Sequence, residues 1–268
     1  SSAADAAREA AALGTAAVCD VSNGGDMAPV WLNAGIGGLV QHEIFGLDLH
    51  AQAGLLRAAA AGARVVQGQG ATIVVRPTAH SLYSTRADVV SCAVGPRGGA
   101  VASIHAAEDS DELMFLGHAT GPLADLVADL GADLSGFHPP GSSPVQTLAE
   151  LGLLGPELLL VHGVHLTRED MSMIALRGSA LCLCPRSNVH IGGRLAAVPA
   201  LLSAGIRLCL GTDSLASAPD MDLFAEAVVL AQAWPTVPDE TWLHLLTAGG
   251  ADALGLPRYG RLEVGCRP

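Results

Sequence analysis

Histidines and carboxylates stand at the ends of several apolar runs in this chain. The segment "SIHAAE" places His105 and Glu108 after one run, "LLLVHGVHL" places His162 after another, and "LCLGTDS" ends a third run in Asp213. A carboxylate at the end of a buried strand costs free energy unless a partner neutralises it. Because imidazole and carboxylate groups are ligands that a cation such as Zn²⁺ takes, the pattern predicts a metal site. The simpler alternative for Asp213 is that it caps the next helix, where Asp and Ser are favoured.

Further strand ends carry polar groups of the same kinds. Glu43 lies in the apolar run at 39–47, His80 follows the next run, and "LCPRSN" places Arg186 and Asn188 after a later one. A single histidine beside an apolar strand is more often a hydrogen-bonded core residue than a ligand. Three strand ends with histidine and a fourth with aspartate are harder to explain by packing, and in a barrel the strand ends converge at one face.

Glu108 lies three residues after His105, an offset that lets both side chains face one pocket just beyond a strand end. A carboxylate beside an activated water is well placed to move protons. The alternative is structural, because "EDSDE" opens a helix and acidic residues favour helix N-termini through the helix dipole. The residues alone leave both interpretations open.

Apolar, β-branched runs that alternate with Ala- and Leu-rich amphipathic stretches must position these side chains. Buried runs that recur after each helix predict a parallel sheet wrapped by helices, in the α/β class. The expected strands are residues 16–21, 39–47, 72–77, 100–105, 158–162, 180–184 and 206–210. The expected helices are residues 3–13, 52–61, 109–116, 121–130, 144–151, 168–176, 195–204, 222–233 and 238–249.

Seven strands are one fewer than a (β/α)₈ TIM barrel requires. The chain opens directly on the helix at 3–13, so we expect a first strand in front of it that these residues do not include. The tail "YGRLEVGCRP" begins a turn toward another strand and stops, so residues 1–268 are expected to form one barrel domain that is incomplete at both ends. The competing architecture is a doubly wound open sheet, which needs a glycine-rich phosphate turn. The segment "SNGGD" at 22–26 is a poor version of that turn.

Composition limits the classes of function. The 268 residues are 50% hydrophobic and only 15% charged, which suits a folded domain and argues against disorder. A net charge of −12 argues against nucleic acid and anionic membranes, and aromatic residues, at 3%, are too few for a base-stacking surface. A small-molecule substrate is the partner that this composition favours.

The chain has six cysteines and no CxxC pair. Four of them, Cys19, Cys182, Cys184 and Cys209, stand in apolar strand-like runs, which predicts small buried side chains in a reducing compartment. The sequence shows neither a signal peptide nor an apolar run long enough to span a bilayer. We therefore expect a cytoplasmic protein, and apolar helix faces leave a homodimer as an option.

These motifs resemble the amidohydrolase superfamily, and within it the branch that holds deaminases and chlorohydrolases. The segments "SIHAAEDSDELMFL", "LLLVHGVHL", "LCLCPRSN" and "LCLGTDSLAS" match that branch in their order: histidine with glutamate three residues later, histidine, Pro-x-Ser-Asn, then Gly-Thr-Asp. The segment "AHSLYST" is similar to its His-x-Pro-Tyr-Ser motif, with Leu82 in place of proline, and "TAGGADALGLPRYGRLEVG" is similar to its closing helix and turn. The resemblance runs from about residue 8 to the end of the chain.

The resemblance implies a metal centre with defined roles. His105 would bind the metal from the fifth strand, and Asp213 would bind it from the eighth strand and act as general base on the attacking water. Glu108 would carry a proton to the ring nitrogen and on to the leaving amine, and His162 would polarise the water or the attacked carbon. The implied cofactor is one divalent metal, with zinc favoured over iron, nickel or manganese.

The resemblance also implies a substrate and the residues that bind it. His80 and His162 would contact the substrate, and Arg186 and Asn188 are further candidates, with Asn188 alternatively holding its loop. The leading hypothesis is hydrolytic deamination of an aminated aromatic N-heterocycle, free or in an adenine nucleoside, including compounds such as aminodeoxyfutalosine. A second hypothesis is hydrolysis of a C–Cl or cyclic amide bond with the same ligands. A third, from another class, is a non-catalytic barrel that acts as a binding protein.

One departure from the family pattern is serious. The family's first strand ends in His-x-His, whose two histidines bind the metal, and no His-x-His occurs in these 268 residues. The missing motif coincides with the missing first strand, and the small β-sandwich that flanks the barrel in this branch is absent as well. The simplest account is a sequence that starts after that strand. The alternative is a degenerate barrel that lost catalysis, which the joint presence of His105, Glu108, His162 and Asp213 argues against.

Overall fold

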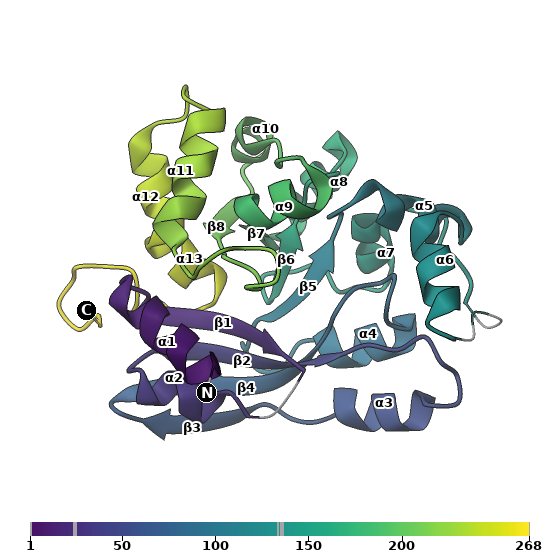
Figure 1. Ribbon diagram of the computed structural model, residues 1–268, viewed down its shortest axis with the longest axis horizontal. Coiled ribbons are helices and arrows are strands. Elements are labelled where there is room, and N and C mark those ends of the chain that lie inside the picture. Colours follow the sequence, from purple (N-terminus) through teal and green to yellow (C-terminus); the bar gives the residue numbers. More distant parts are fainter. Residues whose placement is uncertain (1, 24–25, 133, 135–136, 268) are drawn as a thin grey trace.

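The computed structural model describes residues 2–23, 26–132, 134 and 137–267, and this part of the chain contains eight strands in two four-stranded sheets (Figure 1). The two sheets meet between β4 (Ala71–Ala79) and β5 (Ala102–Ala106). Gly24 and Gly25, which belong to the glycine-rich turn considered for a doubly wound sheet, lie outside the described residues.

The first sheet has the order β1-β2-β4-β3. Its other strands are β1 (Ala17–Ser22), β2 (Gly37–Ile44) and β3 (Arg64–Gly68). Strands β1, β2 and β4 run parallel, whereas β3 pairs antiparallel with β4. The sequence did not predict β3, because three of its five residues are exposed and it carries no continuous apolar face. The turn that joins it to β4 has positive φ at Gln69 and Gly70, a hairpin geometry that Asn or Asp usually signals.

The second sheet is entirely parallel and follows the order of the chain. Strand β5 pairs with β6 (Leu158–His162), which pairs with β7 (Ala180–Leu183), which pairs with β8 (Arg207–Leu210). All four residues of β7 are buried. In each of β5, β6 and β8, every residue except one is buried. Parallel strands that are covered on both faces read as continuous apolar runs, which is why the sequence predicted them.

Strands β4 and β5 form the seam between the two sheets. A bridge pairs Ser81 with His105, and the His105 amide donates a hydrogen bond to the His80 carbonyl oxygen at 2.9 Å. The guanidinium of Arg76, in β4, is buried and donates to the Ala93 carbonyl oxygen at 2.8 Å, which fixes the segment before β5. Seven parallel strands therefore follow one another as β1-β2-β4-β5-β6-β7-β8. This arrangement confirms the barrel class and all seven predicted strands. Within the described residues, β8 and β1 do not pair.

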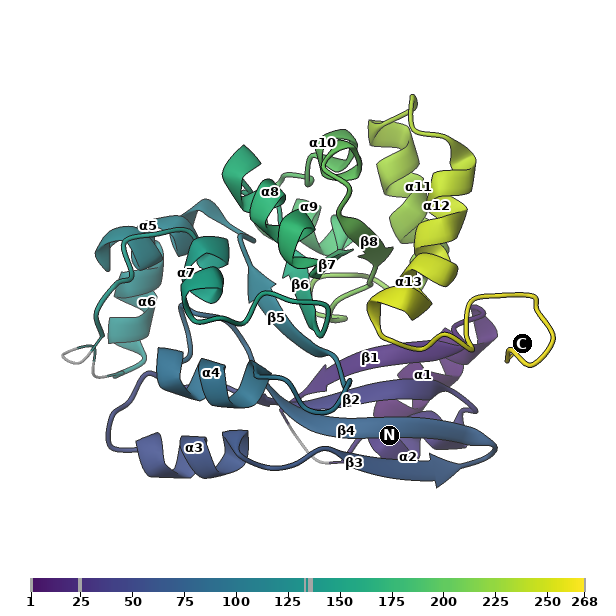
Figure 2. The same ribbon diagram turned by 180° about the vertical axis from the view of Figure 1, so that it is seen from behind.

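Helices cover the outer sides of both sheets (Figure 2). All nine predicted helices are present, and the expected helix at 238–249 is divided into two, α12 and α13. Three further helices, α2, α4 and α9, were not predicted. The helices are α1 (Ser2–Ala12), α2 (Ala28–Asn33), α3 (Gln52–Ala59), α4 (Ala87–Val94), α5 (Ser110–His118), α6 (Pro122–Asp129), α7 (Pro144–Glu150), α8 (Arg168–Arg177), α9 (Pro185–Gly192), α10 (Val198–Ser203), α11 (Leu223–Ala233), α12 (Asp239–Leu246) and α13 (Ala248–Ala253).

One part of the interior between the sheets is packed with cysteine and leucine side chains. Cys182 and Cys209 stand side by side in register on β7 and β8, and they pack with Leu39 and Leu159 from other strands. The prediction of buried cysteines is confirmed for Cys182, Cys184 and Cys209, whereas Cys19 is half-buried. Among the described residues, no helix is both long enough and apolar enough to cross a membrane. The cytoplasmic location and the homodimer stay predictions.

Candidate active site

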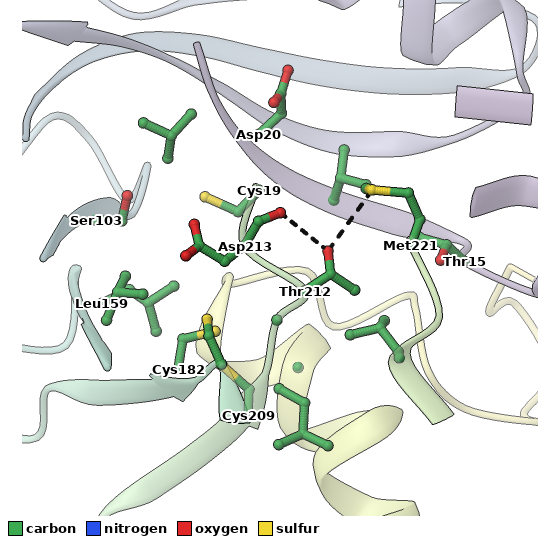
Figure 3. A pocket seen from close by; sticks show the side chains of 18 of the residues that line it. Thr15, Cys19, Asp20, Ser103, Leu159, Cys182, Cys209, Thr212, Asp213 and Met221 are labelled. Atoms are coloured by element: carbon green, nitrogen blue, oxygen red, sulfur yellow. Dashed lines mark hydrogen bonds between the residues drawn. The ribbon is translucent and has the colours of Figure 1, made fainter. Parts of the chain in front are cut away.

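A cavity of about 1220 Å³ opens at the carboxyl ends of the parallel strands and extends into the barrel interior. Figure 3 shows part of its lining, with Asp213 and Thr212 from the loop after β8 and Cys19 and Asp20 from β1. Five of the seven predicted site residues line this cavity, and Arg186 and Asn188 do not. The five are His80, His105, Glu108, His162 and Asp213.

Three imidazoles form a row across the ends of β4, β5 and β6. The ring centroids of His80 and His105 are 4.9 Å apart, and those of His105 and His162 are 5.0 Å apart. His105 Nδ1 lies 2.9 Å from His162 Nε2. Burial lowers the pKa of each imidazole to about 4, and charge repulsion between neighbouring imidazoles adds to this effect. All three rings are therefore neutral near pH 7, the state in which imidazole binds a metal.

Two carboxylates flank this row of imidazoles. Glu43 Oε1 lies 3.8 Å from His105 Nε2, and Glu108 Oε1 lies 3.3 Å from His162 Nε2. Burial raises the pKa of both carboxyl groups, and for Glu108 burial together with the charge of Asp213 raises it to about 7. A carboxyl group whose pKa is near the working pH can take up and release a proton within one catalytic cycle. The position of Glu108 therefore suits proton transfer.

Asp213 follows the apolar run of β8 as the sequence predicted, and its closest partners are serines. Ser187 Oγ donates to Asp213 Oδ2 at 2.5 Å, and Ser217 Oγ donates to the same oxygen at 3.2 Å. Burial alone would raise the pKa of Asp213, but the hydrogen bond from Ser187 and the nearby imidazoles outweigh burial and lower it. The helix-cap alternative for Asp213 is wrong, because Asp222 caps α11.

Three residues other than glycine hold left-handed backbone conformations at the ends of strands in the second sheet. The φ angle is 54° at Ala107 after β5, 78° at His162 in β6 and 58° at Asp213 after β8. Such conformations cost on the order of 1–3 kcal/mol each and persist where the surrounding structure enforces them, most often at functional sites. His162 and Asp213 line the cavity, and Ala107 directly precedes Glu108. The strain therefore coincides with the site.

Nitrogen and oxygen donors gather closely enough in this site to hold a cation. His105, the predicted ligand from the fifth strand, belongs to two such groups, whereas Asp213 belongs to neither. A mixed set of imidazole and carboxylate donors fits zinc or another first-row divalent cation. The pairing of His105 with Asp213 as ligands stays a prediction. The two groups, each with all three donor atoms within 4.8 Å of one another, are Glu43, His80 and His105, and His105, Glu108 and His162.

Asn188 and Arg186 stand in the first turns of α9, behind the cavity wall. Asn188 is buried, and its Nδ2 lies 2.9 Å from His162 Nδ1, which leaves His162 Nε2 as the nitrogen that faces the other site residues. The Arg186 guanidinium is engaged by carboxylates, with Nε 2.6 Å from Glu226 Oε1 and Nη1 2.8 Å from Asp220 Oδ1. The substrate-binding roles predicted for Asn188 and Arg186 stay predictions.

Sequence reasoning missed several side chains that hold the predicted site residues in place. Ser187, which bonds Asp213, is buried and stands between Arg186 and Asn188 in the same motif. Glu226 is fully buried within "LFAEAVVL" and accepts from Arg186. A single acid inside an apolar helical stretch needs a partner, and that signal could have found Glu226. No comparable signal marks Ser187, because serine is common in loops.

Comparison with known proteins places these observations in a family context. A family model described as the amidohydrolase family matches residues 33–268. A 5-methylthioadenosine/S-adenosylhomocysteine deaminase of Haloquadratum walsbyi is 41% identical over 121 residues, which are 42% of this chain and 27% of that protein. An aminodeoxyfutalosine deaminase of Deinococcus radiodurans is 34% identical over 158 residues, which are 57% of this chain and 38% of that protein. The chain therefore spans only 27% to 38% of the length of these curated relatives.

The fold is also similar to that of a solved enzyme. The crystal structure of an adenosine deaminase from Xanthomonas campestris, which has zinc bound, matches with a TM-score of 0.69 and 25% sequence identity. The match covers 97% of this chain and 58% of that chain. Almost every described element of this chain thus has a counterpart in a longer protein.

Proposed function

Because the chain belongs to the amidohydrolase family, we propose that it forms the barrel of a metal-dependent hydrolase that removes the amino group of an aminated N-heterocycle. The observation that carries this proposal is the contact of Glu108 with His162. A carboxyl group with a pKa of about 7 lies there 3.3 Å from a neutral imidazole at the cavity wall. Deamination by water needs a group that accepts a proton from oxygen and delivers it to nitrogen. The deaminase names of two relatives support the same reaction.

The metal in this proposal is held by His105 and Asp213. His105 offers a neutral imidazole near pH 7, and Asp213 offers a carboxylate that Ser187 helps to keep ionised. A divalent cation at this place would supply a water acidic enough to attack the ring carbon at neutral pH. Zinc is the favoured ion, since the structurally similar adenosine deaminase has zinc bound.

Two ligands are fewer than the number zinc takes, because catalytic zinc sites use three protein ligands and one open position. In the described part of the chain, β1 and β8 leave their facing edges unpaired, and residues of both strands line the cavity. We propose that a further strand, not among these 268 residues, lies between β8 and β1 and brings the remaining ligands. Residues 1–268 then form one barrel domain that another segment completes.

The residues of this chain handle the protons of the reaction. Glu108 takes a proton from the attacking water and passes it to the ring nitrogen, and the leaving amine departs as ammonia. His162 is held through Nδ1 by Asn188, so its Nε2 can hydrogen-bond the attacking oxygen. Asp213, whose low pKa keeps it ionised until that step, accepts the second proton of the attacking water, and this proton passes on to the leaving –NH₂ group, which departs as NH₃ and leaves Asp213 ionised again. The overall change replaces the C–NH₂ bond of the ring by C=O.

The substrate in this proposal enters beside His80. The His80 ring lies 4.9 Å from the His105 ring and lines the cavity, so it can contact a heterocycle placed next to the metal. Arg186 and Asn188 are assigned to holding the site, since Arg186 is paired with Glu226 and Asn188 bonds His162. The adenine nucleosides named in the relatives' descriptions, or a compound such as aminodeoxyfutalosine, are the proposed substrates.

Ammonia release by the zinc-loaded full-length protein tests the proposed function. The aminated panel contains adenosine, 5-methylthioadenosine, S-adenosylhomocysteine and aminodeoxyfutalosine, and a chlorinated triazine and a cyclic amide represent the alternative bonds. We expect ammonia from at least one aminated compound, and a loss of about 10²–10⁴-fold in Glu108→Gln. Chloride release alone, or ring opening alone, would move the assignment to the alternative hydrolases. Metal-loaded protein that is inert toward every compound would favour the non-catalytic binding barrel.

A further inference from the structure

Glu112 is a buried carboxyl group that the proposed mechanism does not use. It is the third residue of α5, and it is only 1% exposed. Glu112 Oε2 accepts a hydrogen bond from the backbone N–H of Glu108 at 2.9 Å. One buried side chain therefore binds the backbone of the loop at Glu108 itself.

This contact differs from an ordinary helix cap. The N-cap of α5 is Asp109, whose side chain accepts from the Asp111 amide at 2.9 Å. In a capping box, the third helical residue bonds back to the amide of the N-cap residue. Glu112 reaches past Asp109 to Glu108 instead, so α5 has its cap without Glu112.

Helix α8 shows the ordinary arrangement at the matching place in the next strand–helix unit. Its third residue, Asp170, is also 1% exposed. Asp170 Oδ2 accepts from the Thr167 amide at 2.9 Å and from the Thr167 hydroxyl at 2.8 Å, and Thr167 is the N-cap. Both helices thus begin with a buried acid at the same position. Of these two acids, Glu112 is the one that bonds the loop of a predicted catalytic side chain.

The loop that Glu112 binds has a strained backbone. Ala107 holds φ of 54°, and successive amides around a left-handed residue form a concave site that favours an oxygen ligand. On the other side of the loop, the Ala107 carbonyl oxygen accepts from the His165 amide at 2.9 Å, and the Ala106 carbonyl oxygen accepts from the Gly163 amide at 3.1 Å. The carbonyls of the loop are therefore fixed by the segment after β6, and the Glu108 amide is fixed by Glu112.

We propose that Glu112 is a positioning residue that sets the direction in which the Glu108 side chain leaves the loop. It thereby keeps Glu108 Oε1 in contact with His162 Nε2, 3.3 Å away. This inference rests on the proposed function, because the direction of Glu108 affects turnover only if Glu108 moves protons. Glu112 acts through the backbone, since it is absent from the residues that line the cavity.

The cost of burying Glu112 supports a role beyond starting the helix. Its second oxygen, Oε1, has no hydrogen-bond partner among the described residues, and an unsatisfied buried polar atom destabilises the fold. An interaction with the helix dipole needs no burial, and Asp111 already supplies an acidic residue in the first turn. The hydrogen bond from the Glu108 amide is the contact that requires this residue at this depth.

Two substitutions at Glu112 separate the effect of its hydrogen bond from the effect of its side-chain volume. Two substitutions at Asp170 provide the matched control. Glu112→Met removes the acceptor and keeps a side chain of similar length, whereas Glu112→Gln keeps one acceptor oxygen. Asp170→Ala and Asp170→Asn make the corresponding changes at the start of α8. Hydrogen–deuterium exchange at the Glu108 amide, measured in the full-length protein, reports whether the loop is held. The kcat and KM for ammonia release report the consequence for catalysis.

In Glu112→Met, we expect the Glu108 amide to exchange at least about tenfold faster, because its opening no longer breaks a buried hydrogen bond. We expect kcat to fall by about 10–100-fold with KM nearly unchanged, since a small misplacement of a catalytic group has effects of this size. Glu112→Gln should restore both readouts to near wild type. Asp170→Ala should lower the melting temperature by roughly 2–8 °C and leave both readouts unchanged, and Asp170→Asn should recover part of that stability.

Unchanged amide exchange in Glu112→Met would overturn the proposal, because the loop would then be held by other contacts. Equal losses of kcat in Glu112→Met and Asp170→Ala would also overturn it, since the effect would be general destabilisation. Zinc-loaded wild type that releases no ammonia from any aminated compound defeats the proposed function instead. In that case amide exchange still decides whether Glu112 holds the loop.

Discussion

The two sheets of this barrel contribute unequally to the candidate site. The second sheet carries the strained backbone positions at Ala107, His162 and Asp213. In the described part of the first sheet, the left-handed residue other than glycine is Gln69, which lies in the β3–β4 turn and does not line the cavity. The same residue types occur on both sides of the seam, so composition does not explain the difference. The first sheet supplies Glu43 and His80, and the second supplies His105, Glu108, His162 and Asp213.

The two sheets also differ in the hydrogen bonds that hold their site residues in place. In the second sheet, Asp213 is held by Ser187, His162 by Asn188 and the Glu108 loop by Glu112. In the first sheet, His80 is held by Ser84 at 2.7 Å, and Glu43 lies 3.8 Å from its nearest imidazole nitrogen. We infer that the second sheet performs the reaction and that the first sheet forms the facing wall.

The largest difference between the sheets is expected at their two glutamates. Glu108→Gln removes the proton carrier, so kcat should fall by about 10²–10⁴-fold. Glu43→Gln should lower kcat by less than about tenfold, because Glu43 has no assigned proton transfer and its loss alters only the surroundings of His105. Ammonia release at saturating substrate measures both variants. Equal losses would show that the two sheets share the proton chemistry.

The next largest difference is expected between two serines that hydrogen-bond site residues, Ser187 in the second sheet and Ser84 in the first. Ser187→Ala removes the 2.5 Å hydrogen bond to Asp213, and we expect zinc affinity to fall by about 10–100-fold, as for other partners of metal ligands. Ser84→Ala is the matched change in the first sheet, because Ser84 bonds His80, and we expect less than about threefold there. Competition with a chromogenic zinc chelator gives both affinities. A larger loss of zinc affinity in Ser84→Ala than in Ser187→Ala would assign the metal site to Glu43, His80 and His105 instead.

The pH dependence of stability should depend on the buried acid of the second sheet. Burial raises the pKa of Glu112 to about 8, although the backbone bond from Glu108 opposes this rise. Between the unfolded carboxyl pKa of about 4.3 and pH 8, the folded chain holds a proton that the unfolded chain has released. Stability is therefore lost as pH rises, by up to about 1.4 kcal/mol per pH unit.

Glu112→Gln cannot release this proton, so its stability relative to wild type should increase from pH 5 to pH 8. Urea unfolding at several pH values in that range measures the difference. Glu43→Gln should show the same sign, because burial also raises the pKa of Glu43. A constant difference between Glu112→Gln and wild type across this range would mean that Glu112 is ionised in the folded chain throughout.

The smallest effects are expected for the cysteines, which we interpret as packing residues. Cys182→Ser places a hydroxyl in the interior of the second sheet and should cost about 1–3 kcal/mol of unfolding free energy. Cys92, in α4, is only half-buried, so Cys92→Ser should stay within about 0.5 kcal/mol of wild type. Denaturant midpoints measure both variants. A catalytic defect in Cys182→Ser with unchanged stability would contradict the packing role.

The parts of the fold that could be predicted are those buried on both sides. Strands β6, β7 and β8 are continuous apolar runs because helices and the barrel interior cover both of their faces. Strand β3 could not be found in this way, since Val65 is 64% exposed and the strand has a single partner. Helix α9 was not predicted because "PRSNVHIG" lacks an apolar period. Its ends are instead defined by Pro185 at the start and Gly193 after the last residue.

The site residues, too, fall into a group that could be predicted and a group that could not. His105, His162 and Asp213 could be predicted because chemistry-bearing residues at strand ends stand out against apolar runs. Their supports could not, because those contacts join segments far apart in sequence, as Ser187 and Asp213 do across 26 positions. The reach of Glu112 past the helix cap also depends on the turn at Ala107, which no side-chain pattern announces.

Metal content tests most directly whether the second sheet holds the metal. Plasma mass spectrometry would be applied to the full-length protein and to its His105→Ala and His80→Ala variants. We expect about one zinc per chain in the wild type and in His80→Ala, and little in His105→Ala. Zinc retained in His105→Ala, or absent from all three proteins, would contradict a metal centre built on the second sheet.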